Sequence, residues 1–114
     1  MAYIDIFVVP VPKKKLKAYQ AHAKKWARLW KKMGVLSYTE SIADDVKPGK
    51  LTSFPQSVLL KKDEVVAVGT MTFKSRKHRD TFWKKAMAMP EMSMTDMPFD
   101  GKRMFFGGFK PLAL

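Results

Sequence analysis

Two acidic residues lie in segments that otherwise have the composition of buried strands. Asp5 interrupts the apolar run YIDIFVV, and Glu40 shares one side of its own segment with apolar and aromatic neighbours. A carboxylate held in apolar surroundings has a raised pKa and can exchange protons with a substrate. Asp5 and Glu40 are therefore candidate catalytic residues. The alternative, which we favour, is that each pairs with Arg103 or a tyrosine hydroxyl and sets the register of a dimer.

A histidine and an arginine are the other candidates for a site. His22 lies close to the apolar side of the first predicted helix, three residues after Tyr19. Facing the sheet it would be a third candidate catalytic residue, a general base, although a half-buried histidine at the core boundary is the commoner case. Arg103, at the start of the last predicted strand, is a candidate ligand-binding residue, because a guanidinium can hold an anionic substrate or reach Asp5 or Glu40.

Neither a metal nor a cofactor is predicted. A run of methionines could offer thioether ligands to copper(I), but such runs are more often adaptable apolar filler or a mobile flap. The methionines concerned are Met87, Met89, Met92, Met94 and Met97. The two histidines come without a nearby carboxylate pattern, and the sequence has no zinc motif, nucleotide-binding glycine loop or nucleophile elbow.

The net charge of +12 is the largest anomaly of composition in this chain of 114 residues. It could attract nucleic acid, but lysine outnumbers arginine, whose fork suits specific phosphate and base recognition. The basic first helix also lacks outward aromatic residues on which bases could stack. A solvated lysine surface is the stronger interpretation, so a nucleic-acid partner is possible but not favoured.

The length predicts one domain covering residues 1–114, and the sequence predicts a cytoplasmic protein with no membrane partner. The apolar start, residues 2–12, is not a signal peptide, because Asp5 interrupts it and Pro10 and Pro12 end it. No apolar run approaches the length of a membrane span. The absence of cysteine fits a reducing compartment.

Alternating and helical patterns predict the elements that must position these candidates. Apolar residues recur at three- and four-residue spacing along the first helix, which stops at Gly34. Ser75 is expected to cap the second helix, and Pro90 to end it. The first half of the chain is predicted to form a strand at 3–9 closed by the prolines, a helix at 13–33 and a strand at 35–43. A loop at 44–50, an ambiguous segment at 51–60 and a turn at 62–64 follow. The second half is predicted to form a strand at 65–73, a helix with its apolar face at 79–89, a loop or loosely helical lid at 91–98, and a strand at 102–109.

This order is the ferredoxin-like βαββαβ pattern, an α+β fold with a four-stranded antiparallel sheet and two helices on one face. The strands carry apolar residues on both sides, yet no further element is available to cover the second face. An exposed apolar face of that size favours a homodimer in which two sheets cover each other. A ligand pocket would lie between sheet and helices or at the dimer interface.

Three segments resemble the YbaA-like family of small bacterial proteins of unknown function. They are YIDIFVVPVP at the start, ADDVKPGKLTSF in the middle and MPFDGKRMFFGGF near the end. The resemblance implies a dimeric α/β-barrel, a branch of the ferredoxin-like architecture. It implies no particular activity, although the same fold superfamily contains cofactor-free monooxygenases, isomerases and haem-degrading enzymes. Whether this chain is an enzyme therefore stays open, because a fold does not determine a function.

The last of these segments has a turn and a glycine pair of its own. Asp100 and Gly101 are typical of a turn that leads into the strand, and Gly107-Gly108 suggests a bulge or a close approach of another backbone or a dimer partner. Three hypotheses remain: a small-ligand protein that could be a cofactor-independent enzyme, a nucleic-acid-binding module, and a purely structural or interaction protein. The first leads by analogy of fold.

Overall fold

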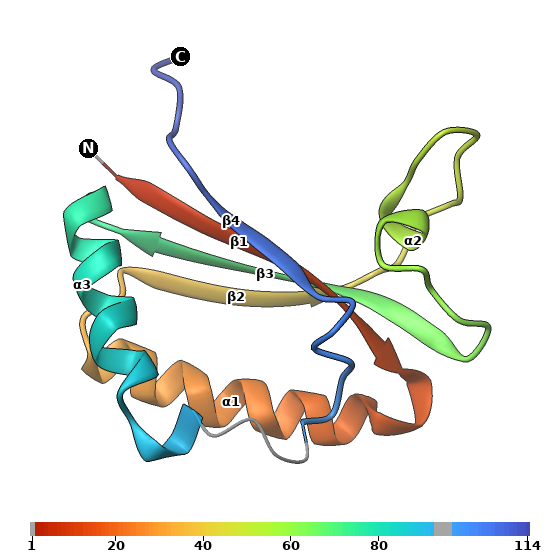
Figure 1. Cartoon of the computed structure of the whole chain (residues 1–114), viewed down its shortest axis with the longest axis horizontal. Helices are drawn as coiled ribbons and strands as arrows, with labels where there is room; N and C mark the ends of the chain where they lie inside the picture. Colours follow the sequence, from red (N-terminus) through yellow and green to blue (C-terminus); the bar gives the residue numbers. More distant parts are fainter. Residues whose placement is uncertain (1, 93–96) are drawn as a thin grey trace.

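The computed structural model describes residues 2–92 and 97–114 and has the predicted α+β architecture. Four strands form one antiparallel sheet in the order β2-β3-β1-β4 (Figure 1). This is the order that two interleaved βαβ units of a ferredoxin-like fold produce. The elements are β1 (Tyr3–Pro12), η1 (Lys13–Lys15), α1 (Leu16–Lys32), β2 (Ser37–Ile42), α2 (Phe54–Ser57), β3 (Glu64–Phe73), α3 (Arg76–Met87), η2 (Pro90–Met92) and β4 (Phe105–Phe109).

Strand β1 is central, and it runs further than its sequence suggested. The prolines do not close it: Pro10 pairs with Val66 and Pro12 with Glu64 in the ladder with β3. Strand β4 pairs with β1 only as far as Val8. Beyond that point β1 has a single partner strand, so residues without an amide hydrogen are tolerated there. The prediction that the strand ends at Val9 was therefore wrong.

Helix α1 follows its apolar pattern. Tyr19, Trp26 and Trp30 are buried, and the indole rings of the two tryptophans stack with 4.7 Å between their centroids. Gly34 has a φ of +95°, the left-handed conformation that ends a helix and that glycine adopts without strain. The predicted stop at Gly34 is confirmed.

The cap predicted for the second long helix is also confirmed. Ser75 accepts a hydrogen bond from the backbone N–H of His78 at 3.1 Å and so caps α3. The ambiguous segment 51–60 contains the short helix α2, which is capped in the same way by Ser53. The predicted lid at 91–98 includes residues 93–96, which lie outside the described residues.

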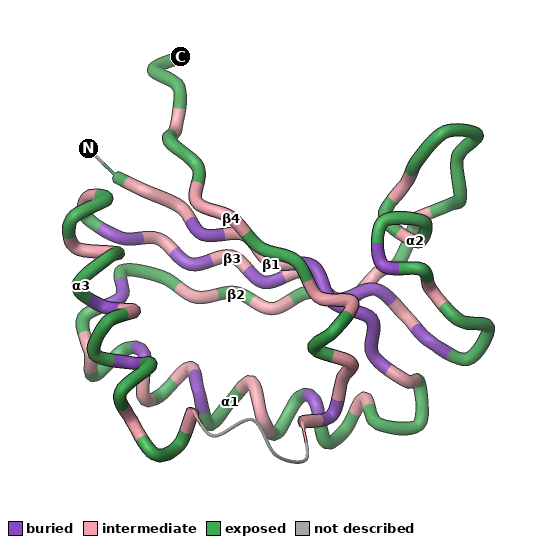
Figure 2. The backbone as a smooth tube through the Cα atoms, viewed as in Figure 1, coloured by how far each residue is buried: buried purple, intermediate pink, exposed green. Residues whose placement is uncertain are grey.

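Both long helices cover the same face of the sheet, as predicted. Trp26 and Trp30 of α1 and Phe82 of α3 form one core cluster with Met71 and Phe73 of β3. Figure 2 shows the buried residues concentrated along β1 and β3 and on the inner sides of the helices. Because the candidates Asp5 and Glu40 lie in this sheet, the helices are placed to enclose them.

The opposite face, which we call the far face, is covered only in part. Val58 packs on Val8 and Val66 there. It comes from residues 43–63, which we call the arm; in Figure 1 the arm and the C-terminal tail both rise on the side away from α1. The remaining far-face residues are Ile4, Ile6 and Val8 of β1 and the residues that lie level with them on the other three strands.

The glycine pair in β4 serves a different purpose from the one expected. Pairing with β1 continues through Gly107 and Gly108 without an extra residue, so the predicted bulge was wrong. A Cβ on Gly108 would lie 2.5 Å from the Tyr3 ring and 2.8 Å from the guanidinium of Arg79. The close approach that the glycine permits is thus made by two side chains of the same chain. The Asp100 turn is confirmed, since the backbone N–H of Lys102 donates to its carboxylate at 2.9 Å.

Candidate functional site

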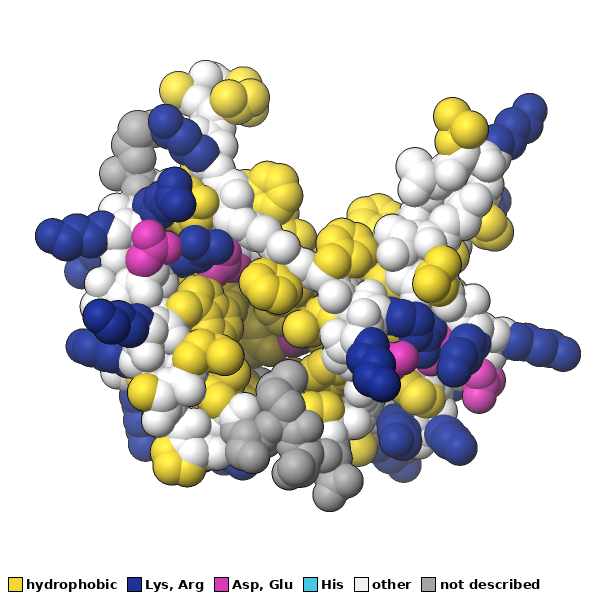
Figure 3. All heavy atoms as spheres, in the orientation of Figure 1, with side chains coloured by type: hydrophobic (Ala, Val, Ile, Leu, Met, Phe, Trp, Pro, Cys, Tyr) yellow, Lys and Arg dark blue, Asp and Glu magenta, His cyan; other side chains and the backbone are white. Residues whose placement is uncertain are grey.

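A cavity of about 630 Å³ lies between the sheet and helices α1 and α3. Most of its lining is aromatic, aliphatic or methionine, and Figure 3 shows hydrophobic side chains lining the hollow on the helix side of the sheet. Ligand pockets in proteins are typically concave and apolar with a few converging polar groups. The titratable groups that line this cavity are Asp5, Tyr19, His22, Tyr38, Glu40, Arg79 and Asp80.

Glu40 is held between two phenols. Tyr19 of α1 donates its hydroxyl hydrogen to Oε1 at 2.7 Å, and Tyr38, two residues away on β2, donates to Oε2. Side chains two apart on a strand point to the same face, and β2 faces α1, so all three residues meet in the cavity wall. The predicted pairing of Glu40 with tyrosine hydroxyls is confirmed.

The cavity wall changes the ionisation of this cluster. Burial raises the pKa of the Glu40 carboxyl, and the hydrogen bonds from the two tyrosines oppose that rise only in part. Burial also raises the pKa values of Tyr19 and Tyr38, with the neighbouring carboxylate adding to the effect. The two phenols therefore remain protonated donors, while Glu40 is the group that can exchange a proton. The direction of this shift is the one expected for a carboxylate in apolar surroundings.

His22 lines the same cavity from α1, one turn before Trp26. The indole N–H of Trp26 donates to its Nε2 at 2.9 Å, so Nε2 carries a lone pair and the neutral ring is protonated on Nδ1. Burial lowers the pKa of His22, and the positive charge of Lys25 lowers it further. The ring also meets Phe99 edge to face. His22 is a neutral, half-buried group in the wall of the cavity, and its role as a base stays a prediction.

Asp5 is buried, and both of its carboxylate oxygens accept hydrogen bonds. The Nε of Arg79 donates to both carboxylate oxygens at 3.0 and 3.1 Å, its Nη2 lies 2.9 Å from Oδ1, and the indole N–H of Trp83 donates to Oδ2 at 2.6 Å. Both donors come from α3 and are one helical turn apart, so they reach the same strand position. Asp5 thus fastens α3 to the central strand at one end of the cavity.

Asp5 and Glu40 line one cavity but do not form a tight pair. Asp5 lies opposite Met71, and Glu40 lies opposite Gly69 two residues further along β3. Their strands are separated by β3, which places them about 10 Å apart across the sheet and about 7 Å apart along the strands, so that about 12 Å separates their Cα atoms. Each carboxylate has its own donors, so the two have separate surroundings and separate chemistry. Their catalytic roles stay predictions.

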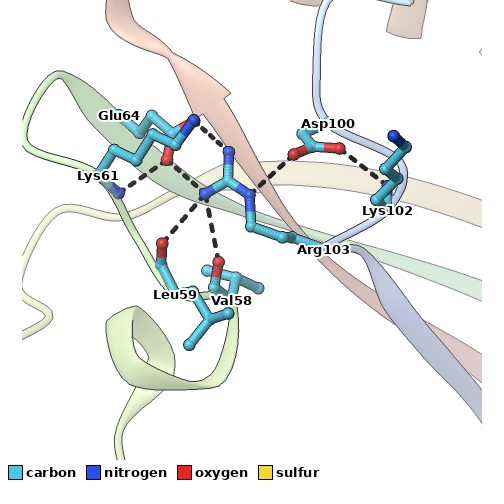
Figure 4. A network of polar contacts seen from close by, with 7 residues as sticks. All are labelled: Val58, Leu59, Lys61, Glu64, Asp100, Lys102 and Arg103. Atoms are coloured by element: carbon cyan, nitrogen blue, oxygen red, sulfur yellow. Dashed lines mark hydrogen bonds and ion pairs between the residues drawn. The ribbon is translucent and has the colours of Figure 1, made fainter.

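Arg103 lies outside the lining of the cavity, and the expected pairing with Asp5 or Glu40 was wrong. Its Nη1 and Nη2 each donate to Glu64 at 2.7 Å, and its Nε donates to Asp100 at 2.8 Å (Figure 4). Nη1 also reaches the backbone carbonyls of Val58 and Leu59 in the arm. The guanidinium is therefore used within the chain, where it joins the turn before β4 to the arm and to the start of β3.

The sequence interpretation missed three residues that organise this region. Glu64 was assigned to a polar turn, but it begins β3 and is buried against Arg103. Arg79 and Trp83 were assigned only to the second helix. Their spacing of four residues places an arginine and an indole donor on one face of α3, and this spacing could have suggested a shared acceptor.

Three of the five methionines that were considered as copper ligands line the cavity: Met87, Met92 and Met97. They line it together with the aromatic rings of Trp83 and Phe99, and flexible thioethers can fill irregular space. Met94 lies outside the described residues. Met87 is nevertheless 65% exposed, so the choice between apolar filler and a mobile flap stays a prediction.

The surface gives little support to nucleic-acid stacking. The tryptophans Trp26 and Trp30 are buried in the core, so the lysine-rich outer side of α1 has no aromatic platform from them. In the described part of the chain, no helix has the length and apolar character needed to cross a membrane. The predicted cytoplasmic location stays a prediction.

Comparison with known proteins places this chain in a family of unknown function. Residues 2–101 match the family described as "Protein of unknown function (DUF1428)". The chain is 41% identical over 114 residues to proteins named "Uncharacterized protein YbaA" from Escherichia coli (strain K12) and Shigella flexneri, covering 98% of this chain and 97% of each relative. The solved structure of "De novo designed protein Foldit4" matches with a TM-score of 0.52 at 7% identity, over 98% of this chain and 100% of that chain, a likeness of fold alone.

Proposed function

Because this chain belongs to the DUF1428 family of proteins of unknown function, we propose a function from the site itself: the protein binds a small, largely apolar molecule in the cavity between the sheet and helices α1 and α3. The resemblance drawn from the three sequence segments to a YbaA-like family is confirmed by the same matches. The family description names no activity, so the chemistry of the cavity has to carry the proposal.

The observation that carries it is an apolar hollow of about 630 Å³ with a few polar groups in its wall. This volume falls within the range of about 300 to 1,000 Å³ that is usual for small-molecule sites. The aromatic walls include the stacked rings of Trp26 and Trp30 and the edge-to-face ring of Phe99. Aromatic walls favour a flat or chain-like apolar body, and the polar groups would orient its head.

A neutral fluorescent probe tests the cavity directly. We expect N-phenyl-1-naphthylamine to bind the protein with increased fluorescence, and Met104→Trp to weaken that binding about tenfold by filling part of the cavity, a loss of 1.4 kcal/mol. Fluorescence titration measures the dissociation constant. Leu51→Trp is the matched control, because Leu51 is 96% exposed on the arm and its replacement should leave the constant unchanged. No binding to the natural chain, or an equal effect of both variants, would contradict the proposal.

We further propose that the working unit is a homodimer joined through the far face. The rows of paired residues there contain no lysine, arginine, aspartate or glutamate, in a chain whose net charge is +12. Two copies with that charge repel each other through most of their surface, so an uncharged face is where they can meet, its β1 and β4 side apolar and its β2 side lined by hydroxyl groups. The rows are Ser37, Thr72, Ile4 and Phe109; Thr39, Thr70, Ile6 and Gly107; and Ser41, Val68, Val8 and Phe105.

The exposed aromatic residues of the far face make the proposed homodimer testable. Phe105 and Phe109 are 45% and 54% exposed, and they lie on edge strand β4. We expect the natural chain to sediment with the mass of two chains, and Phe109→Glu to sediment with the mass of one, because a desolvated carboxylate opposes the contact. Analytical ultracentrifugation measures both masses.

Lys84→Glu is the control for this experiment. It introduces the same carboxylate on the exposed side of α3 and should leave the dimer intact. A natural chain that sediments as a single copy at micromolar concentration would sink the proposal of a homodimer. The proposal of a ligand in the cavity would still stand, since the cavity lies on the opposite face of the sheet.

A further inference from the structure

The charges lining the cavity are opposite in sign to the net charge of the chain. Among the residues that the structure describes, three carboxylates line it, those of Asp5, Glu40 and Asp80, against one guanidinium, that of Arg79. The chain has 22 lysines and arginines and a net charge of +12, yet no lysine is among the lining residues that the structure describes. The described lining of the cavity is therefore acidic on balance, although the chain as a whole is strongly basic.

Two of the three carboxylates already have a cation. Asp5 is held by Arg79 through its Nε and Nη2, and Asp80 lies 2.9 Å from Nη1 of the same guanidinium. Each nitrogen of Arg79 thus contacts a carboxylate, and its charge is shared between two acids. An anionic ligand would have to compete with two carboxylates for this guanidinium.

Glu40 differs from both because its donors are neutral. The hydroxyl groups of Tyr19 and Tyr38 each donate one hydrogen bond, and no ion pair joins Glu40 to a lysine, arginine or histidine in residues 2–92 and 97–114. An ionised carboxylate has about four lone-pair sites, so acceptor capacity remains after these two bonds. The carboxylate therefore has room for a donor supplied by a ligand, and its charge has no partner of opposite sign.

The aromatic walls of the cavity also favour a cationic ligand. The faces of aromatic rings attract cations, tryptophan most strongly, and the attraction increases where water is excluded. Trp26, Trp30 and Trp83 line the cavity together with Tyr38, so the unpaired carboxylate lies in a wall of electron-rich rings. A protonated amine satisfies both the carboxylate and the rings, whereas a carboxylate ligand would be repelled by Glu40.

We propose that the ligand of this cavity is a hydrophobic amine, bound with its apolar body against the aromatic and methionine side chains and its protonated nitrogen donating to Glu40. This inference rests on the proposed function of the cavity and names the chemical class of its ligand. Tyr19 and Tyr38 orient the carboxylate so that its remaining lone pairs are available to the ammonium group. Asp5 and Arg79 neutralise each other and take no part in the selection.

The chemical class of the ligand can be tested by displacing N-phenyl-1-naphthylamine with three compounds that share a phenyl group on a three-carbon chain and differ in their head group. The compounds are 3-phenylpropylamine, 3-phenylpropan-1-ol and 3-phenylpropionate, which present an ammonium, a hydroxyl and a carboxylate group. We expect the amine to displace the probe at a concentration about tenfold lower than the alcohol, as a charge-assisted hydrogen bond would give, and the carboxylate to be weakest. Glu40→Gln should make the amine and the alcohol equal while the affinity for the probe itself is retained.

Asp80→Asn is the matched control, because it removes a lining carboxylate that is 53% exposed and already paired with Arg79. It should preserve the preference for the amine. Equal displacement by the amine and the alcohol in the natural protein, or loss of the preference in Asp80→Asn instead of Glu40→Gln, would overturn this inference and leave the cavity as an apolar binding site. Failure of the probe to bind at all would instead overturn the proposed function.

Discussion

Replacing Glu64 by Gln is expected to lower the free energy of unfolding by about 3 kcal/mol. Glu64 and Arg103 form a two-pronged ion pair at 2.7 Å, and their side chains are only 6% and 14% exposed. Removing one partner leaves the other charge buried, and Arg103 keeps only Asp100 and the carbonyls of the arm. We therefore expect a loss near the lower end of the range for a broken buried pair. Urea unfolding followed by tryptophan fluorescence measures it.

The same pair predicts how stability depends on pH. Hydrogen bonds from Arg103 hold the pKa of the Glu64 carboxyl below its ordinary value. The unfolded chain therefore binds this proton more readily, so the stabilisation is complete above the ordinary pKa and is lost as the pH falls through the lowered one. In Glu64→Gln this part of the loss of stability at low pH should be absent. The difference in the free energy of unfolding between the natural chain and Glu64→Gln should therefore shrink as the pH falls.

Asp63→Asn is the control for this prediction, because Asp63 is the exposed neighbour of Glu64 in the sequence. Its replacement should change the free energy of unfolding by no more than about 0.5 kcal/mol. A variant that replaces both Glu64 and Arg103 by apolar residues should lose less than the sum of the two single replacements, since neither charge is then left alone. Equal losses from Asp63→Asn and Glu64→Gln would refute a special role for the pair.

Asp5→Asn is expected to lower the free energy of unfolding by about 2 kcal/mol. The carboxylate accepts hydrogen bonds from Arg79 and from the indole of Trp83, and an amide retains a single acceptor oxygen for these donors. The Arg79 side chain is 20% exposed and still contacts Asp80, so water and that carboxylate reduce the loss. Guanidinium or urea unfolding measures the change.

Asp80→Asn serves as the comparison for Asp5→Asn, since it removes a carboxylate from the same arginine at an exposed position. We expect a change within about 0.5 kcal/mol, as exposed ion pairs contribute little. If Asp5→Asn were as mild as Asp80→Asn, the buried bonds between β1 and α3 would not stabilise the fold, and our account of Asp5 as a structural anchor would fail.

These two ion pairs separate structural charges from the charge that is available for binding. Arg103 with Glu64 joins the arm to the sheet, and Arg79 with Asp5 joins α3 to the sheet. Glu40 is left in the cavity wall with neutral donors and no cation among the described residues. The preference proposed for an amine follows from this division, because the acids that already have cations are the ones that hold the fold together.

Local signals in the sequence were enough to predict the elements and their order. The apolar spacing of α1, the stop at Gly34, the cap at Ser75 and the turn at Asp100 each depend on residues within a few positions of one another. Helical period, left-handed glycine and side-chain capping are short-range effects, so a single sequence reveals them. The α+β class and the sheet with two helices on one face followed from that order.

The tertiary structure alone decided which charge meets which. Arg79 and Asp5 are 74 positions apart, Arg103 and Glu64 are 39 apart, and Tyr19 and Glu40 are 21 apart. Among 22 cations and 10 acids, no local pattern selects these partners, because the choice depends on strand order and register and on which helix face meets the sheet. The sequence therefore determined that Asp5 and Glu40 would lie in strands, among apolar neighbours. Only the packing of α1 and α3 decided that Asp5 would hold an arginine while Glu40 would face the cavity with two phenols.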